Sequence, residues 1–371
     1  MVNEVTLLLY FICHHCDVDA LIRDGRVIHR ATLEKKVPIT WVFSGVQLRA
    51  FLDNRDRIRR ELGFDLVDAM RGGDFINPRF GYNNPYISEI AGMTYNHVPL
   101  VQPWFPDQRE YLEGILPDQI QRTLDVARYD FDKYIVTFHG PDGTYSPAAA
   151  YKLKQHGLDT LVISGEFLNG DQQAKGKVYW ASGLRHLVRD NSLQIQAREF
   201  YDARRFIDAA QELGHQNESG FVVSGSDSNE VNGMSERYNG MKLEDGIARI
   251  CCIADEAYRR GVKMINCNAA AYWNPNHADL QSIWSNWDDV HAMQNAEGNL
   301  GWLINERNEE IGHVVWLIGE RHRQGWDVRE AKEHFYRAAD SALRHNGYGY
   351  DPFLTGVYNY NIGRARELLQ G

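Results

Sequence analysis

Apolar runs of strand length alternate with segments of helical periodicity over roughly the first 270 residues of the chain. Residues 5–12 and 160–164 are continuous apolar runs, a pattern typical of strands that are covered on both faces. Residues 39–43 and 221–223 repeat the pattern, and segments with helical spacing lie between such runs. Residues 71–88 are rich in Gly, Asn and Pro and predict a long loop that ends at Glu89, and residues 93–100 predict the end of a strand that carries His97. Strands that alternate with helices predict a parallel sheet or barrel.

The spacing of apolar residues changes at about residue 286, after which helical periodicity dominates. Residues 305–324, 328–346 and 357–369 carry helical spacing, and no segment of comparable strand character follows the change. We therefore predict two parts: a parallel sheet or barrel over residues 1–275 and a helical region over residues 276–371 that packs on it.

Composition narrows the class of protein. The 371 residues carry a formal net charge of −10, and this acidic balance argues against nucleic acid or a membrane surface as the main partner. No apolar run approaches the roughly 20 residues needed to span a bilayer, and the N-terminus lacks the basic region and cleavage site of a signal peptide. Five cysteines do not form a disulfide framework, so we expect a cytoplasmic protein. The sequence leaves a homo-oligomer open.

The chain is organised around residues 135–166, which read as one strand–loop–helix–strand unit. The loop of this unit carries His139, Asp142 and Tyr145. In α/β barrels the loops after the carboxyl ends of strands carry the chemistry, which makes these residues candidates for a site. Asp142 also lies in a Pro-Asp-Gly turn, and turn geometry alone explains an aspartate there.

A dense group of ionisable residues, His14, His15, Asp17 and Asp19, follows the first predicted strand. Four such side chains cannot all be buried unpaired without a large cost, so they line a cleft, bind a metal or pair with arginine. Residues two apart on an extended chain face the same way, so His15 and Asp17 can share a divalent metal such as Zn²⁺. Asp19 and His97 complete the candidate metal set. The alternative is a group of substrate-binding or ion-paired side chains without metal.

Two further features bear on chemistry. Asp227 and Glu230 lie in the polar loop that follows residues 221–223, and their position after a strand favours a functional role, with a solvated loop as the alternative. Several tryptophans can provide platforms for sugar rings, with packing in the core or at a domain interface as the alternative. They are Trp104, Trp180, Trp273, Trp284 and Trp287.

Several blocks of the sequence, in the right order, resemble family fifty-seven of the glycoside hydrolases, whose superfamily includes polysaccharide deacetylases. Residues 38–52 (PITWVFSGVQLRAFL) look like the second strand and helix of the family. Residues 88–100 (SEIAGMTYNHVPL) are similar to its E-I-x-G-x-x-Y-x-H-P block, residues 187–193 (LVRDNSL) to its R-D-x-x-L-S segment, and residues 227–233 (DSNEVNG) to its D-x-E-x-x-G loop. The resemblance implies an α/β fold, an incomplete (β/α)7 barrel with a C-terminal helical bundle.

The resemblance also implies roles for single residues. One of Asp227 and Glu230 is the acid/base carboxylate, and Asp17 and Asp142 are the further catalytic candidates. The residues that we expect to bind substrate are His14, Glu89, His97, His139, Tyr145 and Arg189.

The chain departs from the family at two places. The family's H-x-H-Q-P motif is here His14-His15-Cys16-Asp17. Its W-x-P-E segment, which supplies the nucleophile, reads TYSPA over residues 144–148, so that Ala148 stands where the glutamate is expected. A retaining glycosidase needs two carboxylates that flank the anomeric carbon, and an alanine cannot serve as either.

Three hypotheses about function follow. The first is a carbohydrate-active enzyme that acts on an α-linked or amino-sugar substrate, a small molecule or oligosaccharide that supplies its own nucleophile, such as an acetamido oxygen. The second is a metal-dependent deacetylase or amide hydrolase on the same barrel, with a zinc-like ion that activates water. The third is a non-catalytic sugar-binding protein that descends from the glycosidases.

Overall fold

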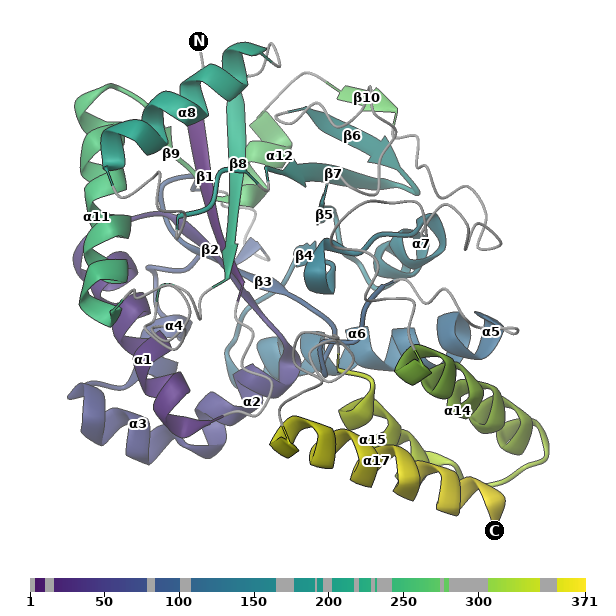
Figure 1. The fold of residues 1–371 in the computed structure, drawn as a ribbon. Coiled ribbons are helices and arrows are strands. Elements are labelled where there is room, and N and C mark those ends of the chain that lie inside the picture. Colours follow the sequence, from purple (N-terminus) through teal and green to yellow (C-terminus); the bar gives the residue numbers. More distant parts are fainter. Residues whose placement is uncertain are drawn as a thin grey trace.

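The computed structural model describes residues 4–10, 17–78, 84–100, 108–164, 177–190, 192–195, 202–216, 220–227, 231, 242–273, 277–279, 306–340 and 352–371. These residues form a mostly parallel sheet that is wrapped by helices, with further helices at the C-terminal end of the chain (Figure 1). The predicted α/β class is confirmed.

The sheet runs in the order β10-β6-β7-β5-β4-β3-β2-β1-β8, and β9 pairs with the start of β1. Among the described residues, every pairing of two strands is parallel except that of β6 with β7. The strands are β1 (Glu4–Tyr10), β2 (Ile39–Phe43), β3 (Glu89–Gly92), β4 (Thr137–His139), β5 (Thr160–Ser164), β6 (Val178–Ala181), β7 (Leu184–Arg189), β8 (Phe221–Asp227), β9 (Lys263–Met264) and β10 (His277–Asp279).

Within the part of the chain that the structure describes, one bridge between the end of β7 and β8 closes the sheet into a ring. The backbone N–H of Asp190, directly after β7, donates to the carbonyl oxygen of Val223 in β8 at 2.8 Å. The ring then contains β1, β2, β3, β4, β5, β7 and β8. An incomplete (β/α)7 barrel has seven strands and is only weakly paired at one point of the ring. The ring here has both features, so this prediction is confirmed.

Alternate residues of the strands face two different cores. Leu8, Val42 and Ala91 belong to an inner cluster inside the ring, whereas neighbours such as Leu7 and Trp41 belong to the larger cluster beneath the surrounding helices. Both faces are therefore apolar, which explains the continuous hydrophobic runs in the sequence.

The helices that follow the strands begin at recognisable caps. Ser44 caps α2 (Gly45–Asp53) through a capping box with Gln47, and Ser146 caps α7 (Pro147–Gln155) by accepting from the N–H of Ala149. The other elements of the barrel are α1 (Val18–Ile28), η1 (His29–Glu34), α3 (Arg55–Leu62), α4 (Leu66–Arg71), α5 (Gln108–Glu110), η3 (Tyr111–Ile115), α6 (Leu116–Asp125), η4 (Val126–Asp130), η5 (Pro141–Gly143), α8 (Ala203–Gln216), α11 (Leu243–Arg259) and α12 (Cys267–Trp273).

The C-terminal helices α14 (Glu306–Arg323), α15 (Arg329–Ala338) and α17 (Pro352–Gln370) lie together beside α5 and α6 (Figure 1). Arg122 on α6 pairs with Glu333 on α15 at 2.5 Å, and Lys332 on α15 pairs with Glu110 on α5 at 3.4 Å. The sheet itself extends past the predicted boundary at residue 275, because β10 pairs with β6.

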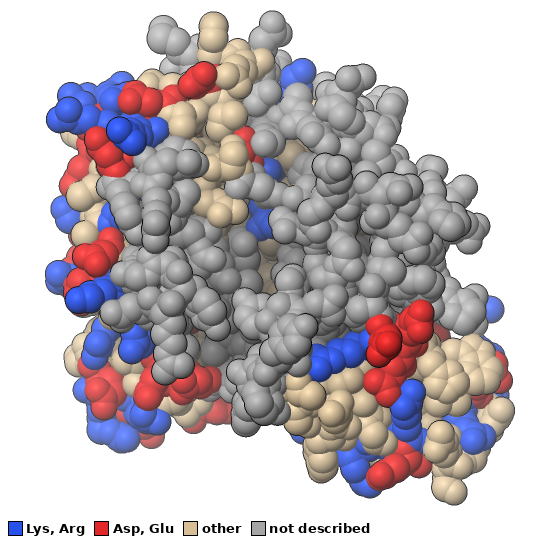
Figure 2. All heavy atoms as spheres, viewed as in Figure 1, with Lys and Arg blue, Asp and Glu red and all other residues tan. Residues whose placement is uncertain are grey.

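The surface that Figure 2 shows carries Lys and Arg interspersed with Asp and Glu over the described helices. Of the helices in the described ranges, none combines the length and the apolar character that crossing a membrane would require.

One predicted element is misplaced. We expected residues 93–100 to be the end of a strand, but β3 ends at Gly92 and the chain then turns, with the N–H of His97 donating to the carbonyl oxygen of Thr94 at 3.1 Å. Glu89 therefore begins a strand and does not end a loop.

Candidate active site at the carboxyl ends of the strands

The loop after β3 holds His97 in an unusual conformation. His97 has a φ of +56°, in the left-handed region, and only 3 % of its surface is exposed. Histidine tolerates this region better than bulky or branched residues do. The hydroxyl of Thr94 donates to the carbonyl oxygen of Val98 at 2.7 Å, and the N–H of Asn96 donates to the side chain of Gln119 on α6 at 2.8 Å. A strained, buried and well-anchored histidine indicates a site.

His139 is the last residue of β4 and is fully buried. Burial lowers the pKa of His139 well below its ordinary value, and electrostatic interactions with Arg189 and His97 lower it further. The imidazole is therefore neutral near pH 7. In this form it presents one N–H donor and one acceptor, or a nitrogen lone pair for a metal.

Arg189 ends β7 and lies between two glycines. A Cβ atom at Gly225, on β8, would lie 2.8 Å from the Cδ atom of Arg189, and one at Gly143 would lie 3.2 Å from its Nη2 atom. Gly143 also has a φ of +73°, which favours glycine, at the end of the turn that contains Asp142. Both glycines thus leave room for a buried guanidinium.

Asp340 enters the same region from the C-terminal helical part of the chain. Its Oδ1 atom lies 4.0 Å from the Nδ1 atom of His97, and both side chains are less than a tenth exposed. Asp340 was not among the residues that we predicted for the site. The one available signal is that it follows the end of α15, where the helix dipole disfavours an acid.

We call His97, His139, Arg189 and Asp340 the mouth cluster. Its first three members come from the carboxyl ends of three parallel strands or the loop that follows one of them, which is where barrels carry their chemistry. A neutral imidazole, a fixed cation and a carboxylate offer donors and acceptors to a polar substrate.

Two predicted catalytic residues have backbones at this same mouth. Asp227 is the last residue of β8 and pairs in register with Tyr10 at the end of β1. Asp142 lies in η5, the turn beside Arg189. The Asp227 and Asp142 side chains, and the whole of His14, His15 and Glu230, lie outside the described residues.

Asp17 and Asp19 have other partners in the structure. Asp17 is the exposed N-cap of α1 and accepts a hydrogen bond from the N–H of Asp19 at 3.1 Å. Asp19 is also exposed, and its carboxylate pairs with Arg57 of α3 at 2.6 Å.

Tyr145 belongs to the outer hydrophobic core. It is 1 % exposed and packs edge-on against His186, with ring centroids 5.3 Å apart. Burial raises the pKa of its hydroxyl group. Tyr145 therefore supports α7 against the sheet, and the structure does not bring it to the mouth cluster.

Glu89 lies at the opposite end of the barrel. Its Oε2 atom accepts from the N–H of Asn268 at 3.0 Å and from the hydroxyl of Thr40 at 3.2 Å. Burial raises the pKa of Glu89 to about 7. Hydrogen bonds with Thr137, the N–H of Asn268 and Thr40 favour the ionised form and offset part of this rise. A strand rises about 3.3 Å per residue, so the length of β3 separates Glu89 from the loop of His97.

A metal centre is not assembled by the described residues, which contain no group of three His, Cys, Asp or Glu side chains that could hold an ion. His139 fits a metal, because its imidazole is neutral. Asp17 and Asp19, which we predicted as ligands, are engaged in a cap and an ion pair at the surface.

Ala148 is the second residue of α7, after Ser146 at the N-cap and Pro147 at the first helical position. It is half-buried. Its methyl group cannot exchange a proton or attack a substrate, so this helix terminus contributes no nucleophile at residue 148.

Comparison with known proteins finds likeness at the level of structure. Neither a protein-family model nor a curated protein matches the sequence. The α-amylase AmyC from Thermotoga maritima has a TM-score of 0.68 and 9 % identity, with 100 % of this chain and 93 % of that chain covered. An exo-type maltose-forming amylase from Pyrococcus sp. ST04 has a TM-score of 0.58 and 11 % identity, over 99 % of this chain and 73 % of that one.

A 4-α-glucanotransferase from Thermococcus litoralis is similar in the same way, with a TM-score of 0.66 and 12 % identity. The match covers 99 % of this chain but only 60 % of the glucanotransferase chain. At such identities the likeness establishes a shared fold, which includes both the barrel and the C-terminal helices.

Proposed function

We propose that this protein is a carbohydrate-active enzyme, a hydrolase or transferase of α-linked or amino-sugar substrates. The observation that carries the proposal is the mouth cluster, in which His97, His139 and Arg189 converge at the carboxyl ends of the strands together with Asp340. The shared fold supports it, because the similar structures are two amylases and a glucanotransferase.

Each polar group has a distinct task in this proposal. The Arg189 guanidinium and the neutral His139 imidazole bind hydroxyl or carbonyl oxygens of the sugar, and Asp227 protonates the leaving glycosidic oxygen. Ala148 cannot attack, so an α-glucan, which has no acetamido group, needs another carboxylate of the chain as its nucleophile, for which Asp142 is the candidate. In an N-acetylated amino-sugar substrate, the acetamido oxygen lies on the face opposite the leaving group and bonds to the anomeric carbon as the glycosidic bond breaks. Water then adds to the anomeric carbon, the bond to the acetamido oxygen breaks, and the proton of the water returns to Asp227.

The test is a screen of the purified full chain against α-glucans and N-acetylated amino-sugar oligomers, with product analysis. We expect one class to be cleaved or transferred, and Arg189→Met to lower kcat/KM about a hundredfold. Arg60→Met on the surface of α3 is the matched control and should leave kcat/KM unchanged. If neither class of substrate turns over, the proposal fails.

A metal-dependent deacetylase or amide hydrolase is the second candidate, favoured by the neutral state of His139. Acetate release from an acetylated sugar that stops on chelation and returns with Zn²⁺ would favour this candidate. Full activity of a protein that elemental analysis shows to be metal-free would exclude it.

A non-catalytic sugar-binding protein is the third candidate, favoured by Ala148. It predicts that calorimetry detects binding of an oligosaccharide that Arg189→Met weakens, while no product forms from that same oligosaccharide. Product formation that depends on Asp227 would exclude this candidate.

A further inference from the structure

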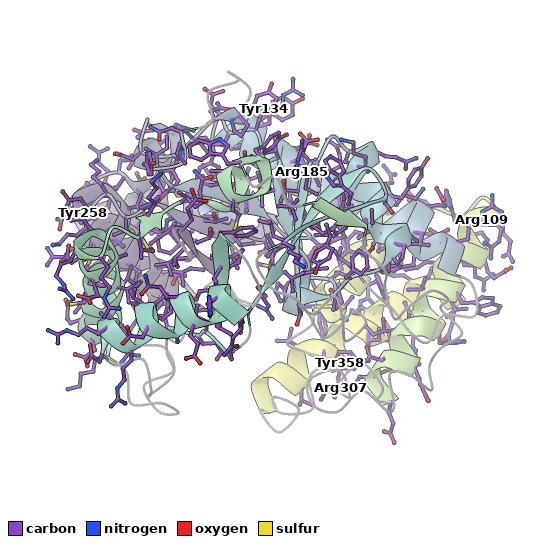
Figure 3. The ribbon with its side chains drawn as sticks, turned by 90° about the horizontal axis from the view of Figure 1, so that it is seen from above. Arg109, Tyr134, Arg185, Tyr258, Arg307 and Tyr358 are labelled. Atoms are coloured by element: carbon purple, nitrogen blue, oxygen red, sulfur yellow. The ribbon has the colours of Figure 1, made fainter. Side chains whose placement is uncertain are left out.

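Two groups of aromatic side chains lie at the amino ends of the strands, far from the mouth cluster. We call Tyr86, Trp180, Arg185, Tyr272 and Trp273 the amino-face platform. Arg185 is the second residue of β7 and pairs in register with Thr160, the first residue of β5, so this group belongs to the amino ends of the strands. Figure 3, which looks at the molecule from above in the view of Figure 1, shows Arg185 beside α12.

The guanidinium of Arg185 is stacked between two rings. Its Cζ atom lies 4.7 Å from the centroid of Trp180 and 3.9 Å from the centroid of Tyr272. Trp273 follows Tyr272 on α12, and its ring meets that of Tyr86 edge-on at 6.5 Å. Segments that are far apart in the sequence thus contribute two groups of rings, which the consecutive residues Tyr272 and Trp273 of α12 connect.

The rings are open to solvent although they are large and apolar. Tyr86 is 48 % exposed, Tyr272 43 % and Trp273 45 %. Fixed polar groups border the rings, since the hydroxyl of Tyr272 donates to Asp159 at 3.2 Å and Lys154 donates to the other oxygen of Asp159 at 2.8 Å. The surface therefore combines flat apolar faces with donors and an acceptor.

Buried hydrogen bonds fix the backbone segments that carry the platform residues. The N–H groups of Asn268 and Cys267, at the start of α12, donate to the buried Glu89 and to Thr40 at 3.0 and 2.8 Å. The side chain of Asn266 donates to the carbonyl oxygens of Asn84 and Ile87, on either side of Tyr86, at 3.0 and 2.9 Å. A platform so fixed loses little conformational freedom when a ligand binds.

We propose that the amino-face platform is a second carbohydrate-binding site, which takes sugar rings of an oligosaccharide or polysaccharide outside the active site. A pyranose has an apolar face of C–H groups and an edge of hydroxyl groups, which match the exposed rings and the bordering Arg185 and Asp159. Aromatic side chains with only two rotatable bonds give such contact at low entropic cost. The choice of sugar as the ligand rests on the proposed function, whereas the existence of a binding surface rests on the exposed rings.

The test is electrophoresis of the full chain through gels that contain starch, glycogen or glycol chitin. To remove binding at the mouth, the measurements use Arg189→Met as the background. We expect at least one polysaccharide to retard this protein, and the pair Tyr86→Ala and Trp273→Ala to weaken the apparent affinity roughly tenfold or more. Because both side chains are about half exposed, melting temperatures should stay close to that of the background protein.

Trp316→Ala and Tyr258→Ala, which remove exposed aromatic rings on α14 and α11, are the matched controls and should leave retardation unchanged. Equal retardation with and without the platform rings, or no retardation by any polysaccharide, overturns the proposal. The two proposals can fail independently. Retardation that depends on Trp273, without turnover of any substrate, would support the platform and contradict the proposed function. Turnover of short oligosaccharides without retardation would support the proposed function and contradict the platform.

Discussion

At the scale of single residues, burial decides the charge state of the groups that matter. His139 and Glu89 are both fully buried, one at the carboxyl end of the barrel and the other at the amino end. The same desolvation lowers the pKa of the imidazole and raises the pKa of the carboxyl group, so that both groups favour the neutral form.

The first prediction concerns Glu89 and the free energy of unfolding. Burial raises the pKa of Glu89 from 4.5 to about 7, so its contribution to stability is complete below pH 4.5 and is lost as the pH rises to about 7. At about 1.4 kcal/mol per pKa unit, the loss is about 3 kcal/mol. Glu89→Gln does not titrate and keeps an acceptor for Asn268. We therefore expect its stability relative to the native protein to increase by about 3 kcal/mol between pH 4.5 and pH 8.

Urea denaturation of both proteins at the two pH values measures this difference. Glu61→Gln, at an exposed position of α3, is the control and should show little change relative to the native protein between them. A difference between Glu89→Gln and the native protein that is the same at pH 4.5 and pH 8 would contradict the prediction.

The second prediction concerns the charge of Arg189. Because the positive charge of Arg189 contributes to the lowered pKa of His139, Arg189→Met should raise the pKa of His139 while burial still keeps it below the ordinary value. NMR titration of the imidazole, assigned with His139→Asn, measures the shift. Arg185→Met, at the far end of β7, should leave the titration of His139 unchanged, and an unchanged titration in Arg189→Met would show that the two charges do not interact.

At the scale of elements, the sequence pattern predicted the barrel well, because both faces of the strands are apolar and the runs are therefore continuous. It failed at β3, where only four residues are paired and the chain turns after Gly92 although Met93, Val98 and Leu100 are apolar and buried. We predicted that Tyr145 binds substrate, but its side chain lies in the outer core. A position after a strand does not reveal whether a side chain faces the mouth of the barrel or the outer core.

The third prediction concerns the close packing of β7 against β8. A methyl group at Gly225 would lie 2.8 Å from the Cδ atom of Arg189, so Gly225→Ala must displace this side chain. Overpacking of this kind costs about 1–3 kcal/mol of stability, and we expect kcat/KM for the substrate found in the screen to decrease about tenfold. Thermal denaturation and steady-state kinetics measure both effects. Gly356→Ala, on an exposed stretch of α17 with open space around it, should reduce neither.

At the scale of the whole molecule, the C-terminal helices form part of the candidate site as well as a cover for the barrel. Asp340 reaches His97 because α15 docks on α6. No local pattern in the sequence encodes this approach: the helical spacing of residues 328–346 predicted α15, but the partner of the helix depends on tertiary packing. The grouping of Trp180 with Tyr272 and Tyr86 also depends on tertiary packing, so the sequence could not predict it.

The last prediction concerns this docking. Arg122 pairs with Glu333 on α15 at 2.5 Å and with Asp118 on its own helix at 3.1 Å, and its guanidinium lies 5.3 Å from the ring centroid of Tyr336. Because the Arg122 side chain is about one-third exposed, solvent screening limits these interactions to about 1–2 kcal/mol in total. We expect Arg122→Met to loosen α15, to speed amide hydrogen exchange over residues 329–338 and to raise KM through the misplacement of Asp340. Arg364→Met breaks an ion pair with Glu367 within α17 and should not affect exchange in α15. Unchanged exchange in Arg122→Met would mean that apolar packing and the Lys332–Glu110 pair dock the helix without Arg122, and Asp340 would then stay beside His97.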